Sequence, residues 1–245
     1  MATTYNIFDI QLYDAMTKEA IISTGGTLYV AATGAYRKAT LVNPDSDYAS
    51  LTNPISATRG KFRFAIANTG LGLPAVDVFG IAPGGQAFRA SNLKPQDRQD
   101  LFINTTNVLQ QLVVPFSISD TTATTETDTG FDLPQHALVM PFVSLDVRTV
   151  DATETMDVGL LSSESGGDAD GFLVGVSVAT ATVVDGTFAS TVTNGALLKV
   201  TATGAAAVIP EGYVVGATAR SVTYTLSAGS DTAEGFIRIP FMLRG

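Results

Sequence analysis

Hydrophobic and polar residues alternate with a period of two along much of the chain. The alternation is clearest at residues 143–149, 221–226 and 237–244. A period of two places every second side chain on the same side of an extended strand, so it predicts strands with one buried and one solvent-facing side. Thr and Val are abundant, and Gly, Pro, Asn and Asp interrupt the chain at short intervals. Together these features predict an all-β protein of sandwiches or barrels.

The last two alternating segments are expected to form a hairpin. Residues 221–227 and 235–243 flank a polar loop that has glycine near both ends, which predicts antiparallel pairing between them. Ser221 and Thr223 would face water, whereas the inward side chains would be Val222, Tyr224, Leu226, Ile237, Ile239, Phe241 and Leu243.

One segment near the middle of the chain has the signals of a helix. Pro95 suits the first helical position, and residues 96–102 can continue the helix. We therefore predict two β-sandwich or jelly-roll-like units, residues 1–92 and residues 106–245, joined by a short helical connector at residues 93–105.

The amino-acid composition disfavours several classes of function. Hydrophobic residues make up 45% of the chain and charged residues 15%, enough apolar material for a packed core. The net charge of −9 disfavours nucleic-acid binding. No apolar stretch is long enough for a membrane span, so no membrane partner is expected. A chain this apolar and poor in charge is expected to bury surface against copies of itself or a partner, and we predict a homo-oligomer.

The stretch ESGGDADGF, residues 164–172, is the most conspicuous candidate site. Its carboxylates could form a calcium site, a catalytic acid pair or a polar turn between two strands. A calcium loop that began at Asp168 would place Asp170 at its third position, but Phe172 and Ala179 stand where the fifth and twelfth ligands belong. The glycines and aspartates suit a turn, which is the interpretation that we favour.

Other catalytic patterns are incomplete. His136 is the one histidine of the chain, and the segment Gly175–Ala179 approximates a nucleophile elbow around Ser177 but lacks its second glycine. No phosphate-binding loop or dinucleotide fingerprint is present, and there is no cysteine. We therefore predict that the protein is not an enzyme, with no catalytic residues, no cofactor and no metal ligands.

Basic and aromatic residues alternate in one further segment. Arg59, Lys61 and Arg63 would share one face of a strand, and Phe62 and Phe64 would lie on the other. The basic face could bind an anion, a strand or an acidic partner surface. A solvated strand face over an aromatic core is the simpler interpretation, and we favour it.

Two parts of the chain resemble structural proteins of tailed phages. The segment GGTLYVAATGAYRKATLVNPDSDYASLTNPISATRGKFRFAI, residues 25–66, is similar to a recurring module in such proteins. Its landmark is an LxNP turn at Leu51-Thr52-Asn53-Pro54, followed by a glycine and a strand of alternating aromatics, and the strand AVDVFGI at residues 75–81 comes next. This module spans residues 25–81, a little under a quarter of the chain. In the C-terminal half, residues 133–149, 154–181 and 221–241 resemble uncharacterised phage structural proteins.

The resemblance implies a virion component of a bacteriophage. The most direct expectation is a capsid decoration (cement) protein on the capsid surface, whose partners are the major capsid protein and its own copies, as a homotrimer that matches a local threefold axis. The alternative is a neck, tail or fibre protein with a host-surface binding role. Residues 1–14 are a candidate arm that could contact the shell, since termini often extend until a partner orders them.

Overall fold

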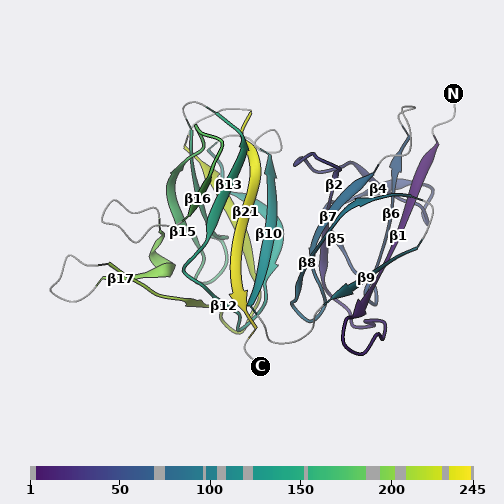
Figure 1. The fold of residues 1–245 in the computed structure, drawn as a ribbon, viewed down its shortest axis with the longest axis horizontal. Coiled ribbons are helices and arrows are strands. Elements are labelled where there is room, and N and C mark those ends of the chain that lie inside the picture. Colours follow the sequence, from purple (N-terminus) through teal and green to yellow (C-terminus); the bar gives the residue numbers. More distant parts are fainter. Residues whose placement is uncertain are drawn as a thin grey trace. The chain divides into compact units, whose positions relative to one another are not determined.

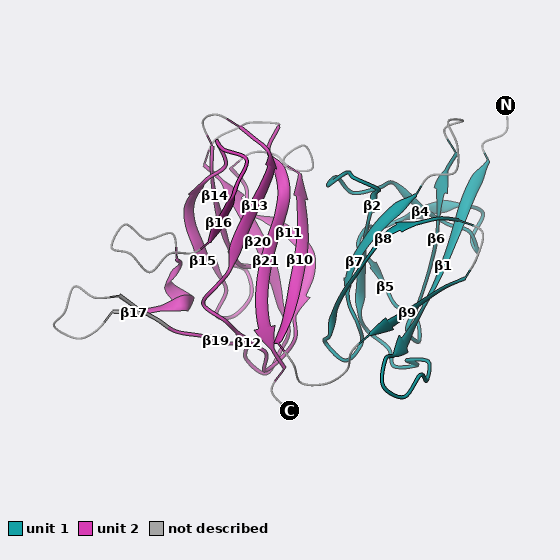
Figure 2. Cartoon of the chain, viewed as in Figure 1, with its two compact units in different colours: residues 1–106 teal, residues 107–245 magenta. Residues whose placement is uncertain are grey.

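The computed structural model describes residues 4–68, 75–95, 98–103, 109–117, 124–151, 154–185, 194–201, 208–227 and 232–243. Contacts divide the chain into two compact units, unit 1 at residues 1–106 and unit 2 at residues 107–245 (Figure 2). Both units are built of β-strands, which confirms the all-β prediction. Within the described residues, no helix is long and apolar enough to cross a membrane.

Unit 1 consists of two sheets around one core (Figure 1). The first, called the β1 sheet, has the order β4 (Ala49–Leu51), β3 (Leu41–Asn43), β6 (Lys61–Ala67), β1 (Tyr5–Asp14) and β9 (Gln99–Ile103). The second, called the β7 sheet, has the order β5 (Ile55–Ser56), β2 (Thr27–Ala32), β7 (Val76–Ile81) and β8 (Ala87–Leu93).

The core of unit 1 comes from alternate residues of both sheets. Phe8 and Phe64, which face each other on β1 and β6, are buried and stack with ring centroids 5.1 Å apart. Leu28, Val30 and Val78 of the β7 sheet belong to the same buried cluster. The alternation of the sequence therefore gives each sheet one apolar side, and the two apolar sides close on each other.

The first strand corrects the expectation of an N-terminal arm. Within residues 1–14, β1 pairs antiparallel with β6 and parallel with β9. Ile10 and Leu12 on β1 are fully buried. Residues 5–14 are therefore a central strand of the core, because their apolar positions alternate, and residues 1–3 lie outside the described residues.

The predicted helical connector at residues 93–105 is also wrong. Its second half forms β9, which pairs in parallel with β1 from Ile10↔Gln99 to Asp14↔Ile103. Ile103 is buried and Leu101 packs against the core of unit 1, whereas Asp100 and Phe102 are exposed. Burial that alternates with a period of two is typical of a strand. Pairing with β1 outweighs the weak helix signal of Pro95.

The LxNP turn lies where the chain of unit 1 crosses from one sheet to the other. β4 is the edge of the β1 sheet and β5 is the edge of the β7 sheet, and a cis Asn53–Pro54 peptide bond lies between them. The Asn53 side chain bonds to backbone groups: its Oδ1 accepts from the Val30 N–H (3.1 Å), and its Nδ2 donates to the carbonyls of Val30 (2.7 Å) and Ala39 (2.9 Å). One carboxamide thus pairs with β2 as a neighbouring strand would.

Unit 2 also has two main sheets. The β21 sheet has the order β16 (Val183–Asp185), β13 (Ser144–Thr149), β21 (Glu234–Met242), β12 (Leu138–Val139) and β19 (Tyr213–Val214), and β10 (Leu109–Ser117) pairs with the other edge of β21. The β20 sheet has the order β11 (Thr127–Leu133), β20 (Arg220–Leu226), β14 (Thr155–Leu160) and β15 (Asp168–Ser177). A 3₁₀ turn (Ala196–Leu198) precedes a small two-stranded sheet of β17 (Lys199–Thr201) and β18 (Val208–Pro210).

Aromatic side chains join the two main sheets of unit 2. The rings of Phe116 on β10 and Tyr224 on β20 lie 6.1 Å apart, and the Tyr224 hydroxyl donates to the Ser117 carbonyl (3.5 Å). Phe241 of β21 is fully buried. Unit 2 is thus a second sandwich-like arrangement with its own core, while its jelly-roll topology stays a prediction.

The predicted C-terminal hairpin is wrong, although both strands exist. β20 pairs with β11 and β14, whereas β21 pairs with β10, β12 and β13 in the other sheet. The predicted inward residues of both strands are buried up to Phe241, and Leu243 follows the end of β21 and is partly exposed. Two strands that each bury one side can face each other across a core as well as pair edge to edge, and the alternation does not distinguish the two arrangements.

The side chain of Asn53 provides a test of the crossing in unit 1. Asn53→Ala removes three hydrogen bonds and leaves the Val30 N–H of β2 without its acceptor, while the Val30 carbonyl keeps the hydrogen bond from the Ala39 N–H (2.9 Å). We therefore expect the free energy of unfolding to fall by about 1–3 kcal/mol. Thr52→Ala, at the exposed neighbouring position, should change it by less than about 0.5 kcal/mol. Urea unfolding of both variants measures the difference, and equal effects would contradict the role of the carboxamide.

Candidate functional site

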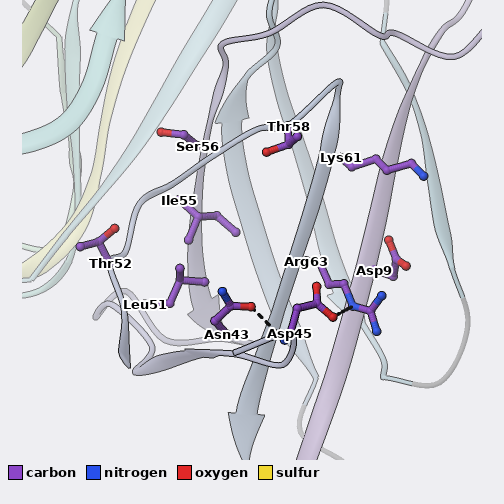
Figure 3. A pocket seen from close by; sticks show the side chains of 10 residues that line it. All are labelled: Asp9, Asn43, Asp45, Leu51, Thr52, Ile55, Ser56, Thr58, Lys61 and Arg63. Carbon is purple, nitrogen blue, oxygen red and sulfur yellow. Dashed lines mark hydrogen bonds and ion pairs between the residues drawn. The ribbon is translucent and has the colours of Figure 1, made fainter. Parts of the chain in front are cut away.

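A groove on unit 1 is the main candidate for a binding site (Figure 3). Its volume is about 620 Å³, within the range of about 300–1,000 Å³ that is usual for small-molecule sites. Residues from β1, β6, the β3–β4 turn and the β4–β5 crossing line it. The crossing that Asn53 holds therefore forms one wall of the groove.

The basic alternation predicted from the sequence supplies the opposite wall. Lys61 and Arg63 are exposed on β6, and Phe62 and Phe64 are buried in the core, as expected. Arg59 does not share their face. It lies in the tight turn before β6, where Arg59 (φ 52°) and Gly60 (φ 67°) both have positive φ and Thr58 and Lys61 exchange backbone hydrogen bonds.

Charges in the groove are balanced. The Arg63 Nε lies 3.6 Å from the Asp45 Oδ1, and Asp9 is the cross-strand neighbour of Arg63 on β1. Asp9, Asp45 and Arg63 lie at one end of the groove, and Lys61 lies at the other with Thr58 (Figure 3). Two carboxylates and two cations give the lining a formal charge of zero.

Several polar groups of the groove have no partner among the residues that the structure describes. Among the described residues, no hydrogen bond or ion pair engages the Asp9 carboxylate, the Lys61 ammonium or the hydroxyls of Thr52, Ser56 and Thr58. These side chains surround an apolar patch of Leu51 and the buried Ile55. The groove therefore presents free donors and free acceptors around an aliphatic surface.

The acidic stretch at residues 164–172 joins two strands, as predicted, but its aspartates are not in the turn itself. The turn runs from Leu161 to Gly167, and Asp168 and Asp170 begin β15. The hydrogen bond between these two carboxyls, with burial and repulsion from Asp170, raises the pKa of Asp168. Among the described residues, no group of three or more His, Cys, Asp or Glu side chains could hold a metal ion.

The residues considered for a catalytic triad do not assemble one. His136 is exposed in a turn with φ 60°, and its backbone N–H lies within hydrogen-bonding distance of the Val215 carbonyl. The Ser177 hydroxyl accepts from the Ala179 N–H (3.2 Å). No hydrogen bond connects the His136 and Ser177 side chains in the described part of the chain.

An ion cluster around a buried aspartate on the β21 sheet was missed by the sequence reasoning. Asp146 is one of the polar residues in the alternating segment 143–149, whose polar side was expected to face solvent, but it is only 2% exposed. Arg148 donates to both carboxylate oxygens of Asp146 at 2.7 Å. Arg238, on the neighbouring β21, also forms an ion pair with this carboxylate. Burial raises the pKa of Asp146, but hydrogen bonds and positive charge from the two arginines outweigh that effect and lower it. The alternation predicts which residues share a face of a strand. It does not predict that Arg238, from another strand, lies beside Asp146.

An apolar row crosses four strands of the same sheet. Leu109 of β10 is opposite Met242 of β21, Met242 is opposite Leu138 of β12, and Leu138 is opposite Val214 of β19. Leu109, Val214 and Met242 are 61%, 43% and 37% exposed. Directly opposed residues lie on one face of a sheet, so these four side chains form a continuous surface, called the apolar row below.

Comparisons with known proteins add little. No known protein family matches the chain, and no curated protein matches it. Among solved structures, it has a weak similarity to the crystal structure of the infectious bursal disease virus VP2 subviral particle. The two share 10% identical residues with a TM-score of 0.24, and the similarity covers 100% of this chain and 72% of that one. A TM-score this low does not establish a common fold.

The turn interpretation of the acidic stretch predicts a small, pH-dependent effect. Asp168→Asn replaces a repelling carboxylate by an amide that can donate to Asp170, so the free energy of unfolding at pH 7 should rise by less than about 1 kcal/mol. Because the pKa of Asp168 is raised in the folded state, the contribution of Asp168 to stability becomes more favourable as the pH falls, and the difference between wild type and Asp168→Asn should vanish in acid.

Urea unfolding from pH 7 to pH 3 measures this difference. Calcium chloride should leave the melting temperature unchanged. A calcium-dependent rise that is lost on changing Asp168→Asn and Asp170→Asn together would contradict the turn interpretation.

The ion cluster predicts a larger effect with the opposite pH dependence. Asp146→Asn should lower the free energy of unfolding at pH 7 by about 1–3 kcal/mol, because Arg148 and Arg238 lose their charged acceptor. Asp100→Asn removes the same charge from an exposed pair with Arg98 and should cost less than about 1 kcal/mol.

The pKa of Asp146 is lowered in the folded state, so its contribution is present above the ordinary Asp pKa of about 3.9 and is lost as the pH falls further. The difference between wild type and Asp146→Asn should shrink accordingly. A difference that stays constant down to about pH 2 would show that the charge of Asp146 is not what stabilises the cluster.

Proposed function

We propose that the protein is a structural component of a tailed-phage virion that binds the assembled capsid and stabilises it, as a decoration or cement protein. The apolar row is the observation that carries this proposal. Exposed apolar side chains that adjoin across several strands are typical of a protein-binding surface. The resemblance of both halves of the chain to phage structural proteins supports a virion partner.

The proposed mechanism is mass action. A protein that binds the assembled shell and not the free subunits stabilises the shell by an amount that grows with its concentration and affinity. Packaged DNA strains the junctions between subunits, and contacts across these junctions would resist that strain. The partners are the major capsid protein and further copies of this chain, arranged as a homotrimer on a local threefold axis.

Substitution in the apolar row tests the proposal. Purified protein is added to particles that lack it, and the bound fraction is measured by sedimentation and cryo-electron microscopy. We expect wild type to occupy a regular lattice, and Met242→Glu to lose about tenfold or more in affinity, because a buried unpaired carboxylate is costly. Ile22→Glu changes a 73% exposed apolar residue of unit 1 and should bind like wild type.

The copy number distinguishes the positions within a virion. A fixed, high ratio to the major capsid protein supports decoration. A few copies at a single vertex would instead indicate a neck, tail or fibre protein and would contradict decoration of the capsid. Absence from purified particles would refute the proposal.

A further inference from the structure

We propose that the groove of unit 1 binds a neutral oligosaccharide. This site is separate from the apolar row of unit 2, and the inference does not depend on capsid binding. It rests on the balance of charge, the free polar groups and the aliphatic patch of the groove.

The balance of charge disfavours ionic ligands. A phosphate or an acidic sugar would approach Lys61 and Arg63 but would meet the carboxylates of Asp9 and Asp45, and Arg63 is already engaged by Asp45 at 3.6 Å. A cationic ligand would be attracted by Asp9 and Asp45 but repelled by Lys61 and Arg63. An uncharged ligand avoids both repulsions and still gains charge-assisted hydrogen bonds from both kinds of group.

The free groups match the chemistry of a polyol. Each sugar hydroxyl can donate one hydrogen bond and accept others. Asp9 and Lys61 have no side-chain partner in the described ranges, so the carboxylate offers an acceptor and the ammonium offers donors. The hydroxyls of Thr52, Ser56 and Thr58 offer both. These groups come from three separate segments around the groove, so a ligand with hydroxyls on several sides can engage them together.

The apolar patch and the size of the groove fit the same ligand. Leu51, which is partly exposed, and the small exposed part of Ile55 (4%) present an aliphatic surface between the polar walls, against which the C–H face of a sugar ring can pack. A volume of about 620 Å³ accommodates a short oligosaccharide. The shape is set by β6 and by the β4–β5 crossing, and the hydrogen bonds of Asn53 fix that crossing before any ligand arrives.

A glycan array tests the inference directly. Full-length protein is applied to printed neutral and acidic bacterial oligosaccharides, and the affinity for the strongest binder is then measured by titration calorimetry. We expect binding to neutral glycans, weakened about tenfold or more by Asp9→Ala and by Lys61→Ala, since each variant removes a charged hydrogen-bonding group. Neither group holds a partner within the described part of the protein, so both variants should keep the melting temperature of wild type.

Matched controls separate the groove from charge in general. Glu19→Ala and Lys94→Ala remove an exposed carboxylate and an exposed ammonium of unit 1 that do not line the groove, and they should bind like wild type. Binding restricted to acidic glycans, equal losses in the controls, or no glycan bound above background would each overturn the proposal. Capsid binding by Asp9→Ala, measured as above, should be unchanged, so failure of one proposal is distinguishable from failure of the other.

Discussion

The side chain of Asn53 is the interaction on which the arrangement of unit 1 depends. A chain that leaves the edge of one sheet and enters the edge of the other exposes backbone groups of the strand that it passes. Asn53 satisfies the N–H and the carbonyl of Val30 and also reaches the Ala39 carbonyl, which one carboxamide can do because it carries both donors and an acceptor. The residues on either side of Asn53 are thereby fixed, with Ile55 buried and Thr52 exposed. The groove has a defined wall as a consequence of this anchoring.

The sequence predicts the strands better than it predicts their partners. Alternation at residues 221–226 and 237–241 correctly identifies β20 and β21 and their buried side chains. It does not predict that the two strands belong to opposite sheets, because burial of one side is the same in a hairpin and across a sandwich core. β9 shows a related limit. Its short alternation around Leu101 and Ile103 is meaningful only beside β1, a partner about ninety positions earlier in the sequence.

Several predictions also assumed that each strand has one face in contact with solvent, and this assumption was wrong for some residues. Thr223 was expected to face water, yet it is fully buried and its hydroxyl donates to the Glu126 carboxylate (3.0 Å). Asp146 is buried by two arginines, one of them from another strand. Polar residues can occupy covered positions when each finds a partner. Glu126 and Arg238 are partners that lie far away in the sequence. Of the candidate site, the sequence predicted Lys61 and Arg63 as an exposed face, but the opposing wall depends on the crossing and could not be found from periodicity.

The two surface features differ in the kind of binding that they can support. The apolar row gains free energy by excluding water, an effect that grows with the area covered and has little directional demand. It suits a permanent contact repeated over a lattice. The groove combines directional polar groups with an apolar patch that is small, so its affinity for one ligand would be modest and its selectivity high. Repeated copies on one particle would raise the overall strength of such weak binding, since each further contact is made at high local concentration. Because each unit has a core of its own, a substitution in the row or in the groove can be examined without disturbing the other.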